Sequence, residues 1–171
     1  MSEPSFITDF IEKLQKLDRR ALAILRRSAS FAPGAYPAAY PYVEHHVGAD
    51  WHPQDSRRQA LYITAMLYAL HPRQADVSLA TALGRLMKAR DSGSIELRFI
   101  ALLAADGDEL PYYLRQIVSL LAADEHGIDY AELLQDLIWW LKSHSPESRD
   151  RIRQKWARDF YRQLAQTPAA A

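Results

Sequence analysis

Apolar residues recur at helical spacing along almost the whole chain, and only short breaks separate the segments that carry this pattern. Helices are indicated near residues 6–17, 19–28, 42–47, 55–70, 78–90, 94–104, 112–123, 131–143 and 146–166. No segment shows the alternation of polar and apolar residues that is typical of a half-buried strand. The pattern predicts an all-α protein, a compact multi-helix bundle of about eight or nine helices.

The breaks between these segments are too short to serve as linkers between independent domains. Residues 1–171 are therefore expected to form a single all-helical domain, with a soft division near 105–109 that could separate two small lobes. The stretch 31–53 is rich in proline and tyrosine and is expected to be a surface loop, in which Pro37 and Pro41 interrupt regular structure.

The composition excludes several classes of function. The chain has no cysteine, which removes disulfides, thiol catalysis and cysteine-based zinc sites. The N-terminus lacks the basic and apolar regions of a signal peptide, and no run of about 18 apolar residues could cross a membrane. A cytoplasmic protein without membrane contact is expected.

The net charge of zero hides an uneven distribution of charge along the chain. Residues 101–136 carry one basic residue against eight acidic residues, whereas residues 142–162 carry seven against three. This asymmetry indicates a polarised surface. The alternative is that the acidic and basic segments pack together and neutralise each other.

Two predicted helices carry a row of cations on one face. In the last helix, spacings of four, three and four residues place the cations on one side, beside a row of apolar residues; the cations are Arg151, Lys155, Arg158 and Arg162. In the second helix, two pairs lie seven residues apart; they are Arg19, Arg20, Arg26 and Arg27. Such rows could follow a nucleic-acid backbone, although an ordinary solvated helix face has the same pattern.

Four further cations lie in less basic parts of the sequence: Arg57, Arg58, Arg98 and Arg115. Each of these, taken alone, is typical of a structural ion pair.

Catalytic and metal-binding patterns do not stand out. The chain contains no HExxH, phosphate-binding glycine loop or nucleophile elbow, and no evident pair of carboxylates. His45 and His46 are adjacent, so their rings would point about 100° apart on a helix and would not converge on one metal ion. We expect neither an enzyme nor a bound cofactor or metal. Gly84 is expected to mark a close helix contact, and one tryptophan of the pair Trp139–Trp140 is expected to lie in the core.

An ordered set of segments resembles the CasB family, the small subunit of type I-E Cascade, which is a CRISPR RNA-guided surveillance complex. The segments are LRRS (25–28), AYPYV (39–43), QAL (59–61), SLATAL (78–83), SGSIELRF (92–99), LRQIV (114–118), IDY (128–130), LIWW (137–140) and WARDFY (156–161). The resemblance implies a non-catalytic helical subunit that lies beside other Cascade protein subunits and a second copy of itself. It also implies contacts with crRNA and target DNA, in which the subunit helps to hold the guide–target hybrid and the displaced DNA strand.

The resemblance assigns nucleic-acid contacts to particular cations. The matching positions are Arg27, Arg57 or Arg58, Arg98 and Arg115, while the cations of the last helix match by region only. Two other classes of function remain open. One is a structural adaptor whose basic faces dock onto acidic proteins. The other is an enzyme with an unrecognised site, which would require a buried cluster of histidine and carboxylate side chains.

Overall fold

The computed structural model describes residues 3–142 and 144–165, and the regular structure of these residues is helical. The nine α-helices are α1 (Glu3–Gln15), α2 (Arg19–Arg27), α3 (Tyr40–Val43), α4 (Ser56–Leu70), α5 (Leu79–Arg90), α6 (Gly93–Ala104), α7 (Leu110–Ala123), α8 (Tyr130–Trp140) and α9 (Pro146–Ala165). Three short 3-10 segments, η1 (Ser28–Ser30), η2 (Pro37–Ala39) and η3 (Glu44–His46), lie between α2 and α4. The described residues form no strand, only an isolated bridge between Gln74 and Ile128. The prediction of an all-α bundle of eight or nine helices is confirmed.

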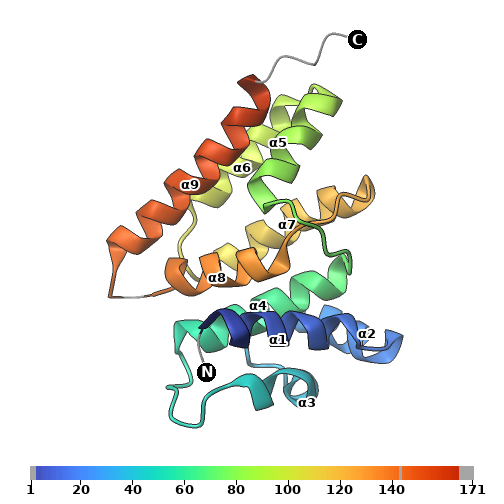
Figure 1. Ribbon diagram of the computed structural model, residues 1–171, viewed down its shortest axis with the longest axis vertical. Helices are drawn as coiled ribbons and strands as arrows, with labels where there is room; N and C mark the ends of the chain where they lie inside the picture. Colours follow the sequence, from blue (N-terminus) through green and yellow to red (C-terminus); the bar gives the residue numbers. More distant parts are fainter. Residues whose placement is uncertain (1–2, 143, 166–171) are drawn as a thin grey trace.

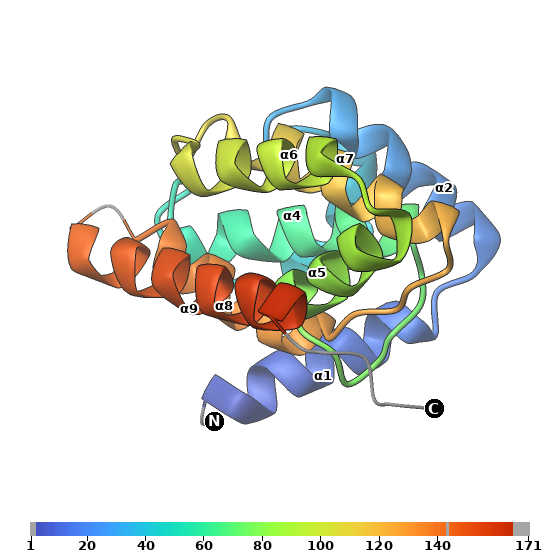
Figure 2. The same ribbon diagram turned by 90° about the horizontal axis from the view of Figure 1, so that it is seen from above.

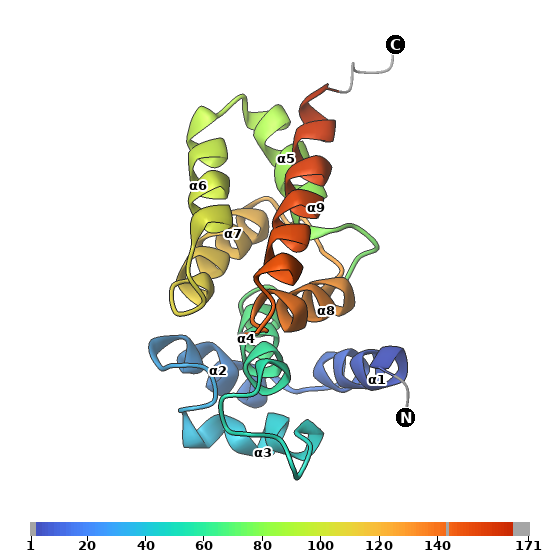
Figure 3. The ribbon, with the colours of Figure 1, turned by 90° about the vertical axis from the view of Figure 1, so that its left-hand side faces the viewer.

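The helices are stacked in three levels. Helices α1, α2, α3 and α4 form the lowest level in Figure 1, α7 and α8 cross above them, and α5, α6 and α9 form the top. The side view in Figure 3 shows the same order. Seen from above, α7 and α8 lie on opposite sides of α4 (Figure 2). Helix α4 is thus surrounded, and each of its residues from Ala60 to Ala69 is buried.

One cluster of buried apolar residues includes side chains from all nine helices. The segment 105–109 joins α6 to α7, and both helices contribute to this shared core. A division of the chain into two lobes at that point stays a prediction.

Helices α5 and α9 pack together closely because Gly84 has no side chain. A Cβ atom at Gly84 would lie 2.7 Å from the carbonyl oxygen of Phe160 and 2.9 Å from the Cβ of Gln163. These distances are too short for an ordinary contact, so the prediction of a close helix contact at Gly84 is confirmed. Phe160 of α9 also stacks on Phe99 of α6, with ring centroids 4.1 Å apart. This contact joins α6 to the packed pair of α5 and α9.

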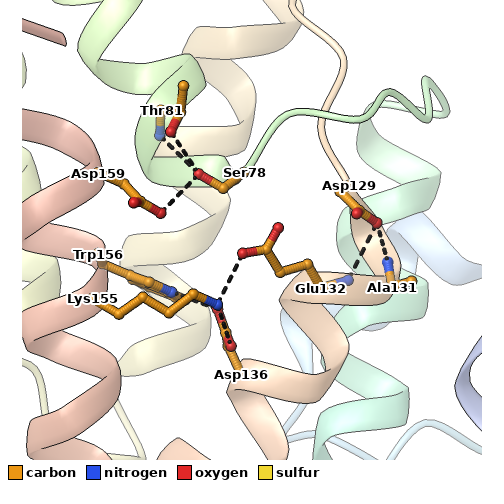
Figure 4. Close-up of polar contacts among 9 residues, drawn as sticks. All are labelled: Ser78, Thr81, Asp129, Ala131, Glu132, Asp136, Lys155, Trp156 and Asp159. Carbon is orange, nitrogen blue, oxygen red and sulfur yellow. Dashed lines mark hydrogen bonds and ion pairs between the residues drawn. The ribbon is translucent and has the colours of Figure 1, made fainter. Parts of the chain in front are cut away.

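Side chains cap several of the helix N-termini. Asp129 precedes α8 and accepts hydrogen bonds from the backbone N–H groups of Ala131 and Glu132, as Figure 4 shows. In a complete capping box the side chain of Glu132, three residues after Asp129, would also accept from the backbone N–H group of Asp129. The Glu132 carboxylate instead forms an ion pair with Lys155 of α9, so only half of that motif is present.

The prediction for the loop 31–53 needs a correction. Pro37 and Pro41 do not interrupt regular structure, because each lies in the first turn of a short helix, where a missing N–H group leaves no hydrogen bond unmade. The short helix predicted at 42–47 begins two residues earlier, as α3, and tightens into η3 after Val43. The predicted ends of the last two helices, at 143 and 166, lie outside the described residues.

Candidate nucleic-acid interface

The four arginines of α2 lie on the exposed side of that helix, opposite the buried Ala21 and Leu25. They are Arg19, Arg20, Arg26 and Arg27. The Nη1 atom of Arg26 donates to the carbonyl oxygen of Ala69 at 3.2 Å. The other three make no hydrogen bond or ion pair with any residue that the structure describes. Three guanidinium groups on this face are therefore free to bind an external anion.

The cationic row of α9 is less uniform than its spacing suggested. Arg151, Arg158 and Arg162 are exposed and have no ion-pair partner within 3–142 and 144–165. Lys155 differs, because its Nζ atom lies 2.8 Å from Glu132 and 3.0 Å from Asp136 of α8 (Figure 4). Lys155 therefore joins α9 to α8, unlike the three unpaired arginines of the row, and its contact with nucleic acid stays a prediction.

Asp136 is the buried acceptor of this contact, and only 5% of it is exposed. It accepts two hydrogen bonds from Lys155 and a third from the indole Nε1 of Trp156 at 2.8 Å. Burial raises the pKa of Asp136 against the lowering effect of these donors. Burial alone lowers the pKa of Lys155, but its hydrogen bonds to Glu132 and Asp136 bring it above its ordinary value. The acidic and basic segments thus neutralise each other here, which is the alternative that the sequence left open.

Arg58 is also a structural arginine. It forms an ion pair with Glu44 at 3.1 Å, and its Nη2 atom donates to the carbonyl oxygen of Gly34. Gly34 has a φ of +78°, and a Cβ atom at this position would collide with the Arg58 guanidinium, so glycine is required. Burial raises the pKa of Glu44, but hydrogen bonds from Tyr62 and Arg58 outweigh it and bring the pKa below its ordinary value. Arg58 therefore holds the loop to α4.

Arg57 is held beside the same loop. Its guanidinium lies 2.9 Å from the carboxylate of Asp55 and 4.1 Å from the centre of the Trp51 ring. Its side chain remains 42% exposed, so a further contact with an anion is sterically open. The sequence left the choice between Arg57 and Arg58 undecided, and the geometry favours Arg57 for an external ligand.

Arg98 lies on the exposed face of α6, in the upper level of the molecule (Figure 1). It has no partner among the described residues, so it emerges from the surface and does not form the ion pair that was the alternative. Its neighbours Leu97 and Ile100 are exposed as well, at 69% and 46%. This face therefore combines one cation with exposed apolar side chains.

Arg115 of α7 is half-buried and lines a cavity of about 660 Å³. We call this the Arg115 cavity; its walls come from η1 and the loop after it, α4, the first turns of α7 and α9, and the end of α8. Arg149 lines the same cavity, and its Nε atom is buried without a hydrogen-bond partner among the described residues. Arg115 likewise has no hydrogen-bond or ion-pair partner there. Two half-buried, unpaired arginines thus converge on one cavity.

The tertiary structure brings together only part of the predicted set. The residues Ser28–Ser30, which follow Arg27, line the Arg115 cavity, so the C-terminal end of α2 leads directly to its wall. Arg98 lies on α6 in the upper level (Figure 3). Arg149 was missed by sequence reasoning because it falls outside the regular row of α9, and only its place in the fold makes it a candidate.

No cluster of three or more His, Asp or Glu side chains that could hold a metal ion occurs in the described part of the chain. His45 and His46 lie near each other, with ring centroids 5.4 Å apart. Within the same residues, none of the helices combines the length and the apolar character needed to cross a membrane.

The fold is thus an all-α bundle whose unpaired surface arginines create local positive potential. The chain belongs to the Cse2 family of CRISPR-associated proteins, also called CasB, whose family pattern matches residues 21–161. The CRISPR-associated protein Cse2 of Thermus thermophilus is 42% identical over an alignment of 164 positions that covers 94% of this chain and 91% of that protein.

Solved structures agree with this assignment. The crystal structure of M. ruber CasB has a TM-score of 0.78 at 36% identity, covering 96% of this chain and 95% of that one. A chain of E. coli Cascade bound to a PAM-containing double-stranded DNA target has a TM-score of 0.67 at 24% identity, covering 94% and 97%. That last likeness shows a common fold.

Proposed function

We propose that this chain is the non-catalytic small subunit of a type I-E Cascade complex and that it binds nucleic-acid backbone. Its partners are the other Cascade protein subunits, a second copy of itself, the crRNA and the target DNA. Membership of the Cse2 family supports the proposal that this chain is part of a Cascade complex, as does the fold that it shares with a chain of E. coli Cascade. In this role the subunit stabilises the guide–target hybrid and the displaced strand.

The proposal rests mainly on the arginines of α2 that have no partner in the described structure. Arg19, Arg20 and Arg27 are exposed and lack a carboxylate partner in the described structure. Formation of an R-loop exchanges one duplex for another of similar stability, so backbone contacts that hold either product can shift the balance. Such contacts need cations and no base-reading geometry.

Charge reversal of this face tests the proposal. The variant Arg19→Glu/Arg20→Glu/Arg27→Glu should assemble normally, because these side chains make no hydrogen bond or ion pair within the described residues. It should weaken target-DNA binding by the assembled complex by at least about tenfold. The control Lys13→Glu/Lys16→Glu/Arg73→Glu makes the same change in net charge at exposed positions elsewhere. Equal R-loop formation by wild type, variant and control would refute the assigned role.

A structural adaptor is the second candidate, and the exposed apolar residues of α6 favour it. Leu97 and Ile100 beside Arg98 form a mixed face of the kind that proteins use to dock onto one another. Crosslinking of the displaced strand separates the two functions. Crosslinks to this subunit support nucleic-acid binding, and their absence in an assembled complex supports the adaptor.

A further inference from the structure

The Arg115 cavity has a lining that contact with a phosphate backbone alone does not explain. Its volume of about 660 Å³ lies within the range of roughly 300–1,000 Å³ that is typical of small-molecule pockets. Aromatic rings from four different parts of the fold line it: Phe31, Tyr36, Tyr62, Tyr112 and Trp140. A backbone groove needs cations, whereas this cavity combines cations with flat apolar faces.

Two of these rings are unusually exposed for their size. Phe31 is 48% exposed and stacks on Tyr36, with ring centroids 4.6 Å apart and planes 16° from parallel. Tyr112, in the first turn of α7, is 55% exposed. Both rings therefore have open surface beside one cavity, and a nucleobase stacks well on such surfaces because every base has a flat π face.

The cavity lining contains more cations than carboxylates. Arg115 and Arg149 are half-buried and have no acidic partner within the described residues. Lys142 is a third cation of the lining, and Asp108 is its only carboxylate among those residues. A partly desolvated cation without a counter-charge is unfavourable, and a phosphate group would supply that charge.

Trp140 adds a hydrogen-bond donor without an acceptor. The residue is 3% exposed and lines the cavity, and its Nε1 atom has no partner among the described residues. Buried donors are nearly always paired with protein or with ordered water, and a ligand in this cavity could supply the acceptor for Trp140. Carbonyl oxygens of bases and phosphate oxygens are both acceptors.

We infer that the Arg115 cavity binds one unpaired nucleotide of a nucleic-acid strand. Its base stacks on Phe31 and Tyr112, and its phosphate lies against Arg115 and Arg149. This inference rests on the proposed function and extends it from backbone contact to the capture of an extruded nucleotide. Because a base inside a duplex is stacked and paired, only a single strand or an extruded nucleotide can enter. The cavity therefore makes the subunit prefer single strands to duplex.

The preference is measured on the full chain at low salt. Affinities are compared for an oligothymidylate of about ten nucleotides and for a duplex of the same length, a span within the site size of single-strand-binding modules. Phe31→Ala and Tyr112→Ala should each weaken binding of the single strand about fivefold or more and leave duplex binding within about twofold. Both side chains are largely exposed, so the fold should persist. Tyr161→Ala removes an exposed ring outside the cavity and should change neither affinity.

A charge variant distinguishes failure of the cavity from failure of the backbone contact. Arg19→Gln/Arg20→Gln should weaken single-strand and duplex binding to the same degree. If it does so while Phe31→Ala and Tyr112→Ala leave the single-strand preference unchanged, the cavity inference is overturned and the proposed function stands. No binding of the single strand at about 0.1 mM, the weak end of non-specific affinities, also overturns the inference. A Tyr112→Ala chain that keeps its single-strand preference but fails to assemble would show that the cavity receives a protein segment instead.

Discussion

The carboxylate of Asp136 joins α8 to α9, the helix that carries most of the C-terminal cations. It accepts from the Lys155 ammonium and from the buried indole of Trp156 (Figure 4). Removing it would leave the Trp156 donor buried without a partner and would leave Lys155 with Glu132 alone. Together with Glu132, this one buried carboxylate holds a member of the cationic row against its own protein.

Substitution of Asp136 tests this role. Asp136→Ala should lower the free energy of unfolding by about 2–3 kcal/mol, because a buried donor and a half-buried ammonium lose their acceptor. Glu132→Ala is the matched control: its carboxylate is 35% exposed and Lys155 keeps Asp136, so the loss should stay below about 1 kcal/mol. Urea denaturation of the three proteins gives both values. Equal losses in the two variants would show that burial of Asp136 is unimportant.

At the scale of the helices, close packing of α5 on α9 sets the position of the cationic row relative to the core. The contact at Gly84 allows the backbone of α9 to approach, and the stacked rings of Phe99 and Phe160 add α6 to the same unit. Any side chain at Gly84 must push the helices apart. The exposed face of α9 would then shift relative to α8, and the Lys155 contact with it.

Gly84→Ala is expected to be destabilising although alanine is the better helix former. In an open helix the change would stabilise by about 1 kcal/mol, but here the new methyl group collides with backbone, which costs roughly 1–3 kcal/mol. Gly93→Ala is the control, since a Cβ atom there has nothing within 4 Å. Thermal and urea unfolding of both variants measure the difference. A Gly84→Ala protein as stable as Gly93→Ala would contradict the close approach of α5 and α9.

At the scale of the whole molecule, a net charge of zero conceals surface cations that have no acidic partner among the described residues. Asp124 forms an ion pair with Arg90 at 2.7 Å, and Asp136 and Glu132 neutralise Lys155. The other acids between 101 and 136 do not cancel Arg19, Arg20 and Arg27 of α2, which make no hydrogen bond or ion pair within the described residues. We expect a neutral protein with a local cationic face to bind nucleic acid weakly by itself, in keeping with the proposed role inside an assembly.

The dependence of binding on salt should report this local face. If about four cations contact a single strand, the logarithm of the binding constant should fall with the logarithm of salt concentration with a slope of about −3. Arg19→Gln/Arg20→Gln should make that slope shallower by about 1.4, because two phosphate contacts are lost. Titrations of the full chain with oligothymidylate at several salt concentrations provide the slopes. A slope near zero for wild type would exclude backbone contacts.

Helices, caps and the exposed α2 face were predictable because they depend on residues close together in the chain. The four arginines of α2 lie opposite its buried Ala21 and Leu25, as their spacing on one helix face requires. The pair Trp139–Trp140 divided as expected into an exposed and a buried ring. Pro41 was misplaced because the same residue that ends a helix is also favoured in its first turn. The ordered motifs identified the family without any structure.

Only the tertiary structure showed which partner, if any, each cation has. Lys155 pairs with a residue 19 positions away, and Arg58 with one 14 positions away. Arg115 and Arg149 meet at one cavity although the whole of α8 lies between them. Helical periodicity acts over a few residues and therefore fixes which face of each helix is polar, and with it the all-α class and the family pattern. Whether a polar side chain on that face meets solvent, a carboxylate or a cavity is set by the packing of distant helices, and no local spacing encodes it.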